Sequence, residues 1–315
     1  MSITGFYGRA EMYSDKSRTI ATTLAGTIFL YAAFAVLISV EPALLRPFSD
    51  PRYPALSKLL IPLGRGVADF LYASAIAIAV YFSYCLLGKL GRFRSRRIAR
   101  KPVDPGQVRR ETWLAANFAL AAGIQAVAYL VLWQLGLLRI YASISERGWP
   151  YAMLSLALFL LLSDAWFYLC HFFYHRNRFV FRNIHAVHHL SVVTTPMTNS
   201  QISPWELLPS TAFSIVYLMI VPMAMPVLSF MVIVVSLYLI LLHSGYEIFP
   251  RGTATHWVGR WLVTPTYHQM HHELFTKHVG LYFTWWDRVF GTHSDQYAAR
   301  FDEVTARGST QAVAP

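Results

Sequence analysis

The chain has 315 residues, of which 55% are hydrophobic and 14% are charged. Soluble domains carry roughly 25% charged residues, so this composition argues against an ordinary soluble protein and favours a membrane protein. The net charge of +11 raises the question of nucleic-acid binding. The membrane explains this charge better, because the basic residues gather in a loop beside apolar stretches. We therefore expect no nucleic-acid partner.

The predicted elements begin after a polar segment, residues 1–18, which has none of the features of a cleavable signal peptide. Five stretches without Asp, Glu, Lys or Arg follow, at residues 19–40, 70–88, 112–138, 148–163 and 207–246. About 20 apolar residues span a bilayer, so the last stretch is long enough for two crossings. Pro222 and Pro226 near its middle indicate a helical hairpin. The pattern predicts an all-α integral membrane protein with about four to six transmembrane helices.

The loop of residues 89–110 holds nine of the 27 Lys and Arg residues. The positive-inside rule places such a loop in the cytoplasm. Alternating the spans from this loop places both termini there as well, in a multi-pass topology. We expect a cytoplasmic N-terminal segment (1–18), transmembrane helices with the basic loop (19–150), a catalytic domain (151–296) and a disordered tail (297–315).

The histidines lie in one half of the chain. Of the 12 His residues, none precedes position 171. Three motifs hold eight of them: H-F-F-Y-H at 171–175, H-A-V-H-H at 185–189 and H-Q-M-H-H at 268–272. His243 lies where the predicted hairpin returns to the cytoplasm. Each motif places imidazoles on one helical face, and the topology brings all three to the same side of the membrane. We expect them to form a cytoplasmic, histidine-rich cap around one site.

Neutral imidazole is a common metal ligand, and crowded imidazoles gain little unless a cation holds them together. Nine histidines are too many for one ion with four to six ligands, so the pattern indicates two ions. Imidazole suits zinc, copper, iron and nickel alike. The zinc-protease pattern H-E-x-x-H is absent, because Thr276 stands where its second His would be. Cys85 and Cys170 indicate neither a disulfide framework nor a Cys-ligated metal.

The three motifs, in this order and spacing, resemble the sterol desaturase/fatty acid hydroxylase superfamily of membrane di-iron enzymes. The phrases "SDAWFYLCHFFYH", "FRNIHAVHHLS", "HSGYEIFPRG" and "GLYFTWWDRVFGT" carry the resemblance from about Ser163 to His293. "KPVDPGQVRRE" resembles the loop before the third span. The match is most similar to the C-5 sterol desaturase-like subgroup. Ser203 departs from the pattern, because related sequences often have His before this Pro.

The resemblance implies iron-ligand roles for His171, His175, His185, His188, His189, His268, His271 and His272, and a further ligand role for His243. His278 departs from the family, which often has Asn there, and we include it among the candidate ligands. Asp164, two helical turns before His171, could orient a ligand imidazole or simply form hydrogen bonds within the helical bundle. Glu273 could accept hydrogen bonds from ligand imidazoles or lie at the surface.

The expected activity is oxygen-dependent hydroxylation or desaturation of a membrane lipid, sterol-like or acyl. The expected cofactors are two iron ions (Fe2+/Fe3+), with dioxygen as co-substrate. No flavin, nicotinamide, haem-domain or Fe–S motif is present, so electrons must come from outside the chain. We expect a reductase with a cytochrome b5-like or ferredoxin-like carrier as the donor. Such a carrier could dock on the basic loop. The same histidines leave open a membrane zinc hydrolase, a metal transporter or a membrane haem protein.

Overall fold

The computed structural model describes residues 94–310, and this part of the chain is mostly helical. Its main α-helices are α4 (Pro105–Gln134), α5 (Gly148–Arg176), α7 (Pro204–Ile220), α8 (Met225–Leu242), α9 (Pro265–Leu274), α10 (Trp285–Val289) and α11 (Gln296–Thr310). The prediction of an all-α fold is confirmed, apart from a pair of two-residue strands, β1 (Ile140–Tyr141) and β2 (Met223–Ala224). The short 3-10 helices are η2 (Arg94–Arg96), η3 (Ile144–Glu146), η5 (His188–Leu190), η6 (Pro196–Ser200) and η7 (Gly259–Trp261).

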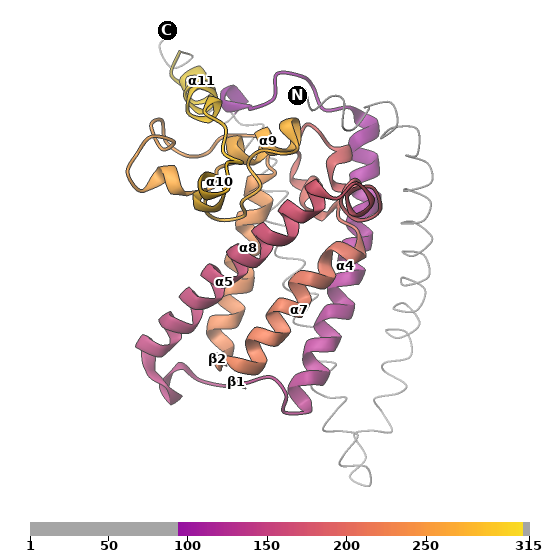
Figure 1. The fold of residues 1–315 in the computed structure, drawn as a ribbon, viewed down its shortest axis with the longest axis vertical. Coiled ribbons are helices and arrows are strands. Elements are labelled where there is room, and N and C mark those ends of the chain that lie inside the picture. The colour runs from indigo at the N-terminus through magenta and orange to yellow at the C-terminus, as the bar shows by residue number, and fades with distance from the viewer. Residues whose placement is uncertain (1–93, 311–315) are drawn as a thin grey trace.

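Helices α4, α5, α7 and α8 form an elongated bundle, with β1 and β2 at its lower end in Figure 1. The predicted hairpin within residues 207–246 is confirmed, because α7 ends at Ile220 and Pro226 lies in the first turn of α8. The two strands run parallel, with Ile140 opposite Met223 and Tyr141 opposite Ala224. Leu218, Met223 and Phe159 belong to the apolar core at this end of the bundle. This core fixes how the helices approach each other below the histidines.

Two helices within residues 94–310, α5 and α8, are long and apolar enough to cross a membrane. Both expose many large apolar side chains, including Leu154, Leu161 and Leu169 on α5 and Phe230 on α8. Such surfaces are costly in water and favourable in lipid, so they indicate a membrane protein. The predicted total of four to six spans is not confirmed, and the stretches 19–40 and 70–88 lie outside the described residues.

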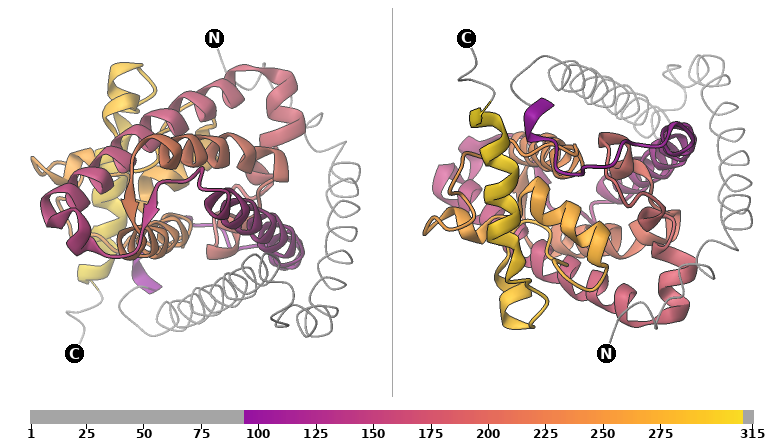
Figure 2. Two further views of the ribbon diagram at one scale, coloured as in Figure 1. Left: turned by 90° about the horizontal axis from the view of Figure 1, so that it is seen from below. Right: turned by 90° about the horizontal axis from the view of Figure 1, so that it is seen from above.

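Helices α9, α10 and α11 lie together at the upper end of the bundle and form a cap (Figure 1). Tyr267 of α9 packs with Tyr297 and Phe301 of α11 in a second apolar core. Figure 2, seen from above, shows α11 passing beside η2. The prediction that residues 297–315 form a disordered tail is wrong for 297–310, which belong to α11. Tyr297, Phe301 and Val304 are buried at helical spacing, a stripe that the surrounding charges obscured.

The segment between α5 and α7 folds back over the upper end of the bundle in short turns. It contains α6 (Arg178–Val180), a π-helical turn (η4, Phe181–His185), η5 and η6. Asn177 ends α5 and its side chain accepts a hydrogen bond from Val180 N at 3.1 Å, which starts the next turn. These tight reversals place the second histidine motif directly against the first.

Candidate metal centre

The first histidine motif occupies the last turns of α5. His171 and His175 are four residues apart, so they lie on one face of the helix. The side chains of both are buried. The third motif is in α9, which begins at Pro265 after Thr264, whose Oγ1 accepts a hydrogen bond from Tyr267 N. All residues of α9 from Pro265 to His272 are buried, so this polar helix lies inside the cap.

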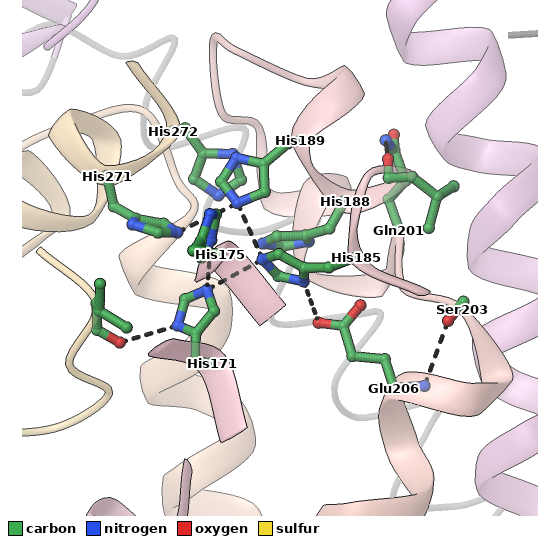
Figure 3. Close-up of polar contacts among 12 residues, drawn as sticks. His171, His175, His185, His188, His189, Gln201, Ser203, Glu206, His271 and His272 are labelled. Atoms are coloured by element: carbon green, nitrogen blue, oxygen red, sulfur yellow. Dashed lines mark hydrogen bonds and ion pairs between the residues drawn. The ribbon is translucent and has the colours of Figure 1, made fainter. Parts of the chain in front are cut away.

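The structure sorts nine histidines into two groups, and within each group the ligand nitrogens all lie within 4.8 Å of one another. The first, called here the five-His group, comprises His171, His175, His185, His189 and His271. The second, the four-His group, comprises His188, His243, His268 and His272. All nine are buried (Figure 3 shows seven of them). The convergence predicted for the three motifs and His243 is therefore observed in the fold.

Hydrogen bonds at Nδ1 orient several of these rings. Backbone carbonyls bind Nδ1 in four pairs: His171–Val279 (2.8 Å), His271–Lys277 (2.8 Å), His243–Leu239 (2.8 Å) and His272–Ser191 (3.0 Å). A carbonyl oxygen can only accept, so Nδ1 of each ring carries a proton. In a neutral imidazole the other nitrogen, Nε2, then presents a lone pair. Each of these four rings is thus set to donate electrons from Nε2.

The Nε2 atoms of the grouped imidazoles point at one another, so the distances between them show whether a cation fits there. His171 Nε2 and His185 Nε2 are 3.0 Å apart, and Nδ1 of His185 bonds to Glu206. If both rings are neutral, two lone pairs face each other with no proton between them, which is repulsive without a cation. Ligand nitrogens ~2.0–2.1 Å from one ion lie about 2.9–3.4 Å apart. The Nε2 contacts within the two groups span 2.8–3.5 Å, close to this range, so both groups fit a bound metal ion.

The cap also keeps the imidazoles in the form that binds metal. Burial, and then neighbouring imidazoles, lower the pKa values of His188, His189, His268 and His272 well below the ordinary value. Burial lowers the pKa of His243 to about 4 and that of His271 to about 3. These rings are therefore neutral at physiological pH, and neutral imidazole is the ligand form.

Aromatic side chains surround the five-His group. The ring centroid of Phe275 lies 4.8 Å from that of His189, and the ring of Phe181, which is fully buried, lies 5.4 Å from His175. Phe167 lies 5.0 Å from His171. An apolar shell of this kind limits the access of water to a metal site and lowers the local dielectric constant.

Sequence reasoning missed two glutamates near the site, the partly buried Glu206 and the buried Glu111. Glu206 Oε1 lies 2.9 Å from His185 Nδ1 (Figure 3). The motif S-P-W-E before an apolar run is typical of a helix start, and it gave no indication that Glu206 also contacts His185. Glu111 of α4 accepts hydrogen bonds from Ser191 Oγ (2.6 Å) and Thr198 Oγ1 (2.8 Å). It thereby holds Ser191, whose carbonyl orients His272. No motif in the sequence indicated this contact.

The two predicted carboxylates lie elsewhere. Asp164 accepts hydrogen bonds from Tyr282 N (2.8 Å) and Trp285 Nε1 (3.0 Å), so it joins α5 to the cap within the helical bundle. Glu273 accepts a hydrogen bond from Gln269 Nε2 at 3.0 Å. The hydrogen bonds that the structure shows at these two carboxylates do not involve the nine grouped histidines.

His278, the tenth candidate ligand, belongs to neither group. Its backbone has a φ of 60°, and its ring is fully buried against Tyr267, with ring centroids 3.9 Å apart. The ring centroid of His293 lies 5.5 Å from that of His278. The structure therefore places nine of the ten candidate ligands in the two groups, and a ligand role for His278 stays a prediction.

Residues 156–292 match the family model described as fatty acid hydroxylase. A Delta(7)-sterol 5(6)-desaturase of Aspergillus fumigatus is 27% identical over 299 residues, which cover 87% of this chain and 88% of that protein. Lathosterol oxidase of Mus musculus is 28% identical over 238 residues, 74% of each chain. Cholesterol 25-hydroxylase of Mus musculus is 31% identical over 134 residues, 42% of this chain and 44% of its own. No solved structure matches the chain.

Proposed function

We propose that the chain, which matches the fatty acid hydroxylase family model over residues 156–292 and is similar to sterol desaturases, hydroxylates or desaturates a membrane lipid with dioxygen at a di-iron centre. The family and the relatives indicate an oxidoreductase that acts on lipids. The observation that carries the proposal is the pairing of the two histidine groups, whose neutral, buried imidazoles direct Nε2 lone pairs at common points. Iron bound there would activate dioxygen for attack on an unactivated C–H bond.

The chain's own residues hold and shield this centre. The five-His group would bind one ion and the four-His group the other. Backbone carbonyls fix the rings of His171, His271 and His243 in the orientation that presents Nε2. Phe181 and Phe275 pack against the five-His group, where they would limit the access of water. This environment suits iron as well as zinc, since imidazole binds both, so the proposal of iron rests on the family.

The position of the centre supports a lipid substrate. His171 and His175 lie at the C-terminal end of α5, a helix whose other face exposes Leu158, Leu161 and Leu169. A lipid in the bilayer would therefore meet the protein along the same helix that carries two of the proposed ligands. The relatives include both desaturases and a hydroxylase, and both reactions begin by removing a hydrogen atom from carbon. The proposal leaves the choice between them to experiment.

We further propose that the cap faces the cytoplasm, with both termini on that side of a multi-pass protein. The nine Lys and Arg residues of the loop 89–110 support this orientation. An external carrier, cytochrome b5-like or ferredoxin-like, would supply electrons. The exposed side chains of Lys101 and of Arg109, which lies near the start of α4, belong to this basic segment and would attract an acidic carrier. Neutralising both should slow turnover with the reductase system and leave metal content unchanged. Unchanged turnover would contradict docking at this loop.

The test of the function is a comparison of lipids. Wild type and His271→Ala would be expressed in the same aerated host with its native reductase, and total lipid extracts compared by mass spectrometry. We expect a species that only the wild type produces. A mass increase of one oxygen identifies a hydroxylase, and a loss of two hydrogens a desaturase. Equal lipid profiles from equally expressed proteins, with no iron in the wild type, would overturn the proposal and favour a zinc hydrolase or a transporter.

A further inference from the structure

Glu206 gives one ligand of the proposed centre a charged partner. Its Oε1 lies 2.9 Å from His185 Nδ1, and its side chain is only 11% exposed (Figure 3). The second oxygen, Oε2, is buried without a hydrogen-bond partner among the described residues. A carboxylate in this setting has been taken out of water, which is costly unless a nearby positive charge stabilises it.

Helix α7 supplies part of that stabilisation. Glu206 is in the first turn of α7, and Ser203 Oγ accepts a hydrogen bond from its backbone N (3.3 Å). The positive end of the helix dipole favours a negative charge at this position. At the carboxylate itself, the donor that the structure shows is the Nδ1–H group of His185. The local structure thus holds an anionic oxygen against one imidazole.

The partners of the other oriented rings are weaker acceptors. Nδ1 of His171 and of His271, in the five-His group, bonds to backbone carbonyls. The same is true of His243 and His272 in the four-His group. A carbonyl is neutral, whereas a carboxylate that accepts the Nδ1–H of a ligand imidazole raises the basicity of its Nε2. His185 is therefore a stronger donor than an imidazole held by a carbonyl.

The two groups also differ in the number of nitrogens that they offer, five against four. His185 belongs to the larger group, so the extra nitrogen and the charged partner act on the same ion. Among the described residues, the four-His group offers one nitrogen fewer, so an ion bound there would have one more coordination position for other ligands. Both differences favour tighter binding at the five-His group.

We propose that the two metal positions are unequal, and that Glu206 is a positioning residue that makes the five-His group the tighter one. This inference rests on the proposed di-metal centre and states which of its two positions binds metal more tightly. The ion in the four-His group is then the more exchangeable of the two. It is also the ion with more room for an exogenous ligand.

Zinc titration of the full-length protein tests this proposal without dioxygen, reductant or substrate. The detergent-purified protein would be stripped of metal and titrated with Zn2+ against a competing chelating indicator. Wild type should bind two ions in separate steps. His268→Ala should weaken or abolish the weaker step, and His175→Ala the tighter step. Glu206→Gln should weaken the tighter step about 10- to 100-fold and leave the weaker step unchanged.

Glu206→Asp keeps a carboxylate and should retain more of the tighter step than Glu206→Gln. Glu303→Gln is the matched control: it removes a carboxylate on α11 that pairs with arginines, and it should change neither step. Equal affinities in wild type, or equal weakening of both steps by Glu206→Gln, would overturn the proposal. If Glu206→Gln does not fold, the wild-type, His268→Ala and His175→Ala titrations still decide whether the two positions are unequal and which group is tighter. Glu206→Asp, whose shorter side chain should weaken only the tighter step, then tests the role of the carboxylate. Binding of no zinc would instead contradict the di-metal centre on which the proposed function depends.

Discussion

At the scale of single residues, histidines that are adjacent in the sequence belong to different groups. His188 belongs to the four-His group and His189 to the five-His group. Likewise, His271 belongs to the five-His group and His272 to the four-His group. Neighbouring residues in a helical turn point about 100° apart, so they cannot serve one ion together. The i, i+4 pairs His171/His175 and His268/His272 each stay within one group.

His278 supplies a prediction at this scale. Because its ring lies against Tyr267 and outside both groups, His278→Ala should retain both metal ions. His175→Ala, which removes a member of the five-His group, should lose one. Metal analysis of the purified proteins, with His256→Ala as a control for an exposed histidine, measures both. A metal loss in His278→Ala equal to that in His175→Ala would show that His278 is a ligand.

At the scale of elements, the cap is held to the rest of the chain by polar contacts as well as by its apolar core. Asp164 on α5 holds the backbone at Tyr282 and the indole of Trp285. Asp287 on α10 accepts hydrogen bonds from Val279 N and Gly280 N (2.7 and 2.9 Å). These carboxylates fix the segment 278–285, whose carbonyl at Val279 orients His171. A loop without regular structure is thereby made rigid enough to position a ligand.

Helix α11 should respond to acid through Glu303. Hydrogen bonds from Arg307 and Arg100 lower the pKa of Glu303 to about 2 from its ordinary value of 4.5. A lowered folded-state pKa means that this stabilisation is complete above pH 4.5 and is lost as the pH falls toward 2. We expect α11 to exchange its amide hydrogens faster as the pH falls through this window, after correction for intrinsic rates. The residue is largely exposed, so high salt should reduce the effect.

Glu303→Gln is the comparison for that measurement. The variant should show faster exchange in residues 296–310 already at neutral pH, and a smaller additional change on acidification. Exchange in α9, which packs beside α11, serves as the internal reference. If wild type and variant protect α11 equally at neutral pH, the ion pairs with Arg100, Arg300 and Arg307 contribute nothing measurable.

At the scale of the whole molecule, the histidine groups connect elements that are far apart in sequence. The five-His group joins α5, the turns η4 and η5, and α9, and the four-His group joins η5, the end of α8, and α9. Metal binding would therefore cross-link the bundle and the cap. Ions that bind only the folded protein stabilise it by mass action.

Removal of metal should accordingly lower the thermal stability of the whole protein. Each ion present at 1,000 times its Kd contributes about 4 kcal/mol, so chelation should reduce Tm markedly. Thermal unfolding of the detergent-purified protein with and without chelator measures the effect, and re-addition of Fe2+ under anaerobic conditions should restore the original Tm. A variant that lacks one ligand, such as His271→Ala, should respond less. An unchanged Tm after verified metal removal would mean that the apoprotein already holds this arrangement without ions.

The sequence alone determined the helical class, the hairpin of α7 and α8, and the list of histidines, because apolar run length and residue spacing along a helix are local properties. It also pointed to the family, whose motifs are local too. Only the tertiary structure decided which imidazoles share a group, that Glu206 faces His185, and that His278 lies apart. It also revealed α11, whose buried stripe depends on α9. These features arise from contacts between residues up to about a hundred positions apart, and no spacing rule in the sequence encodes them.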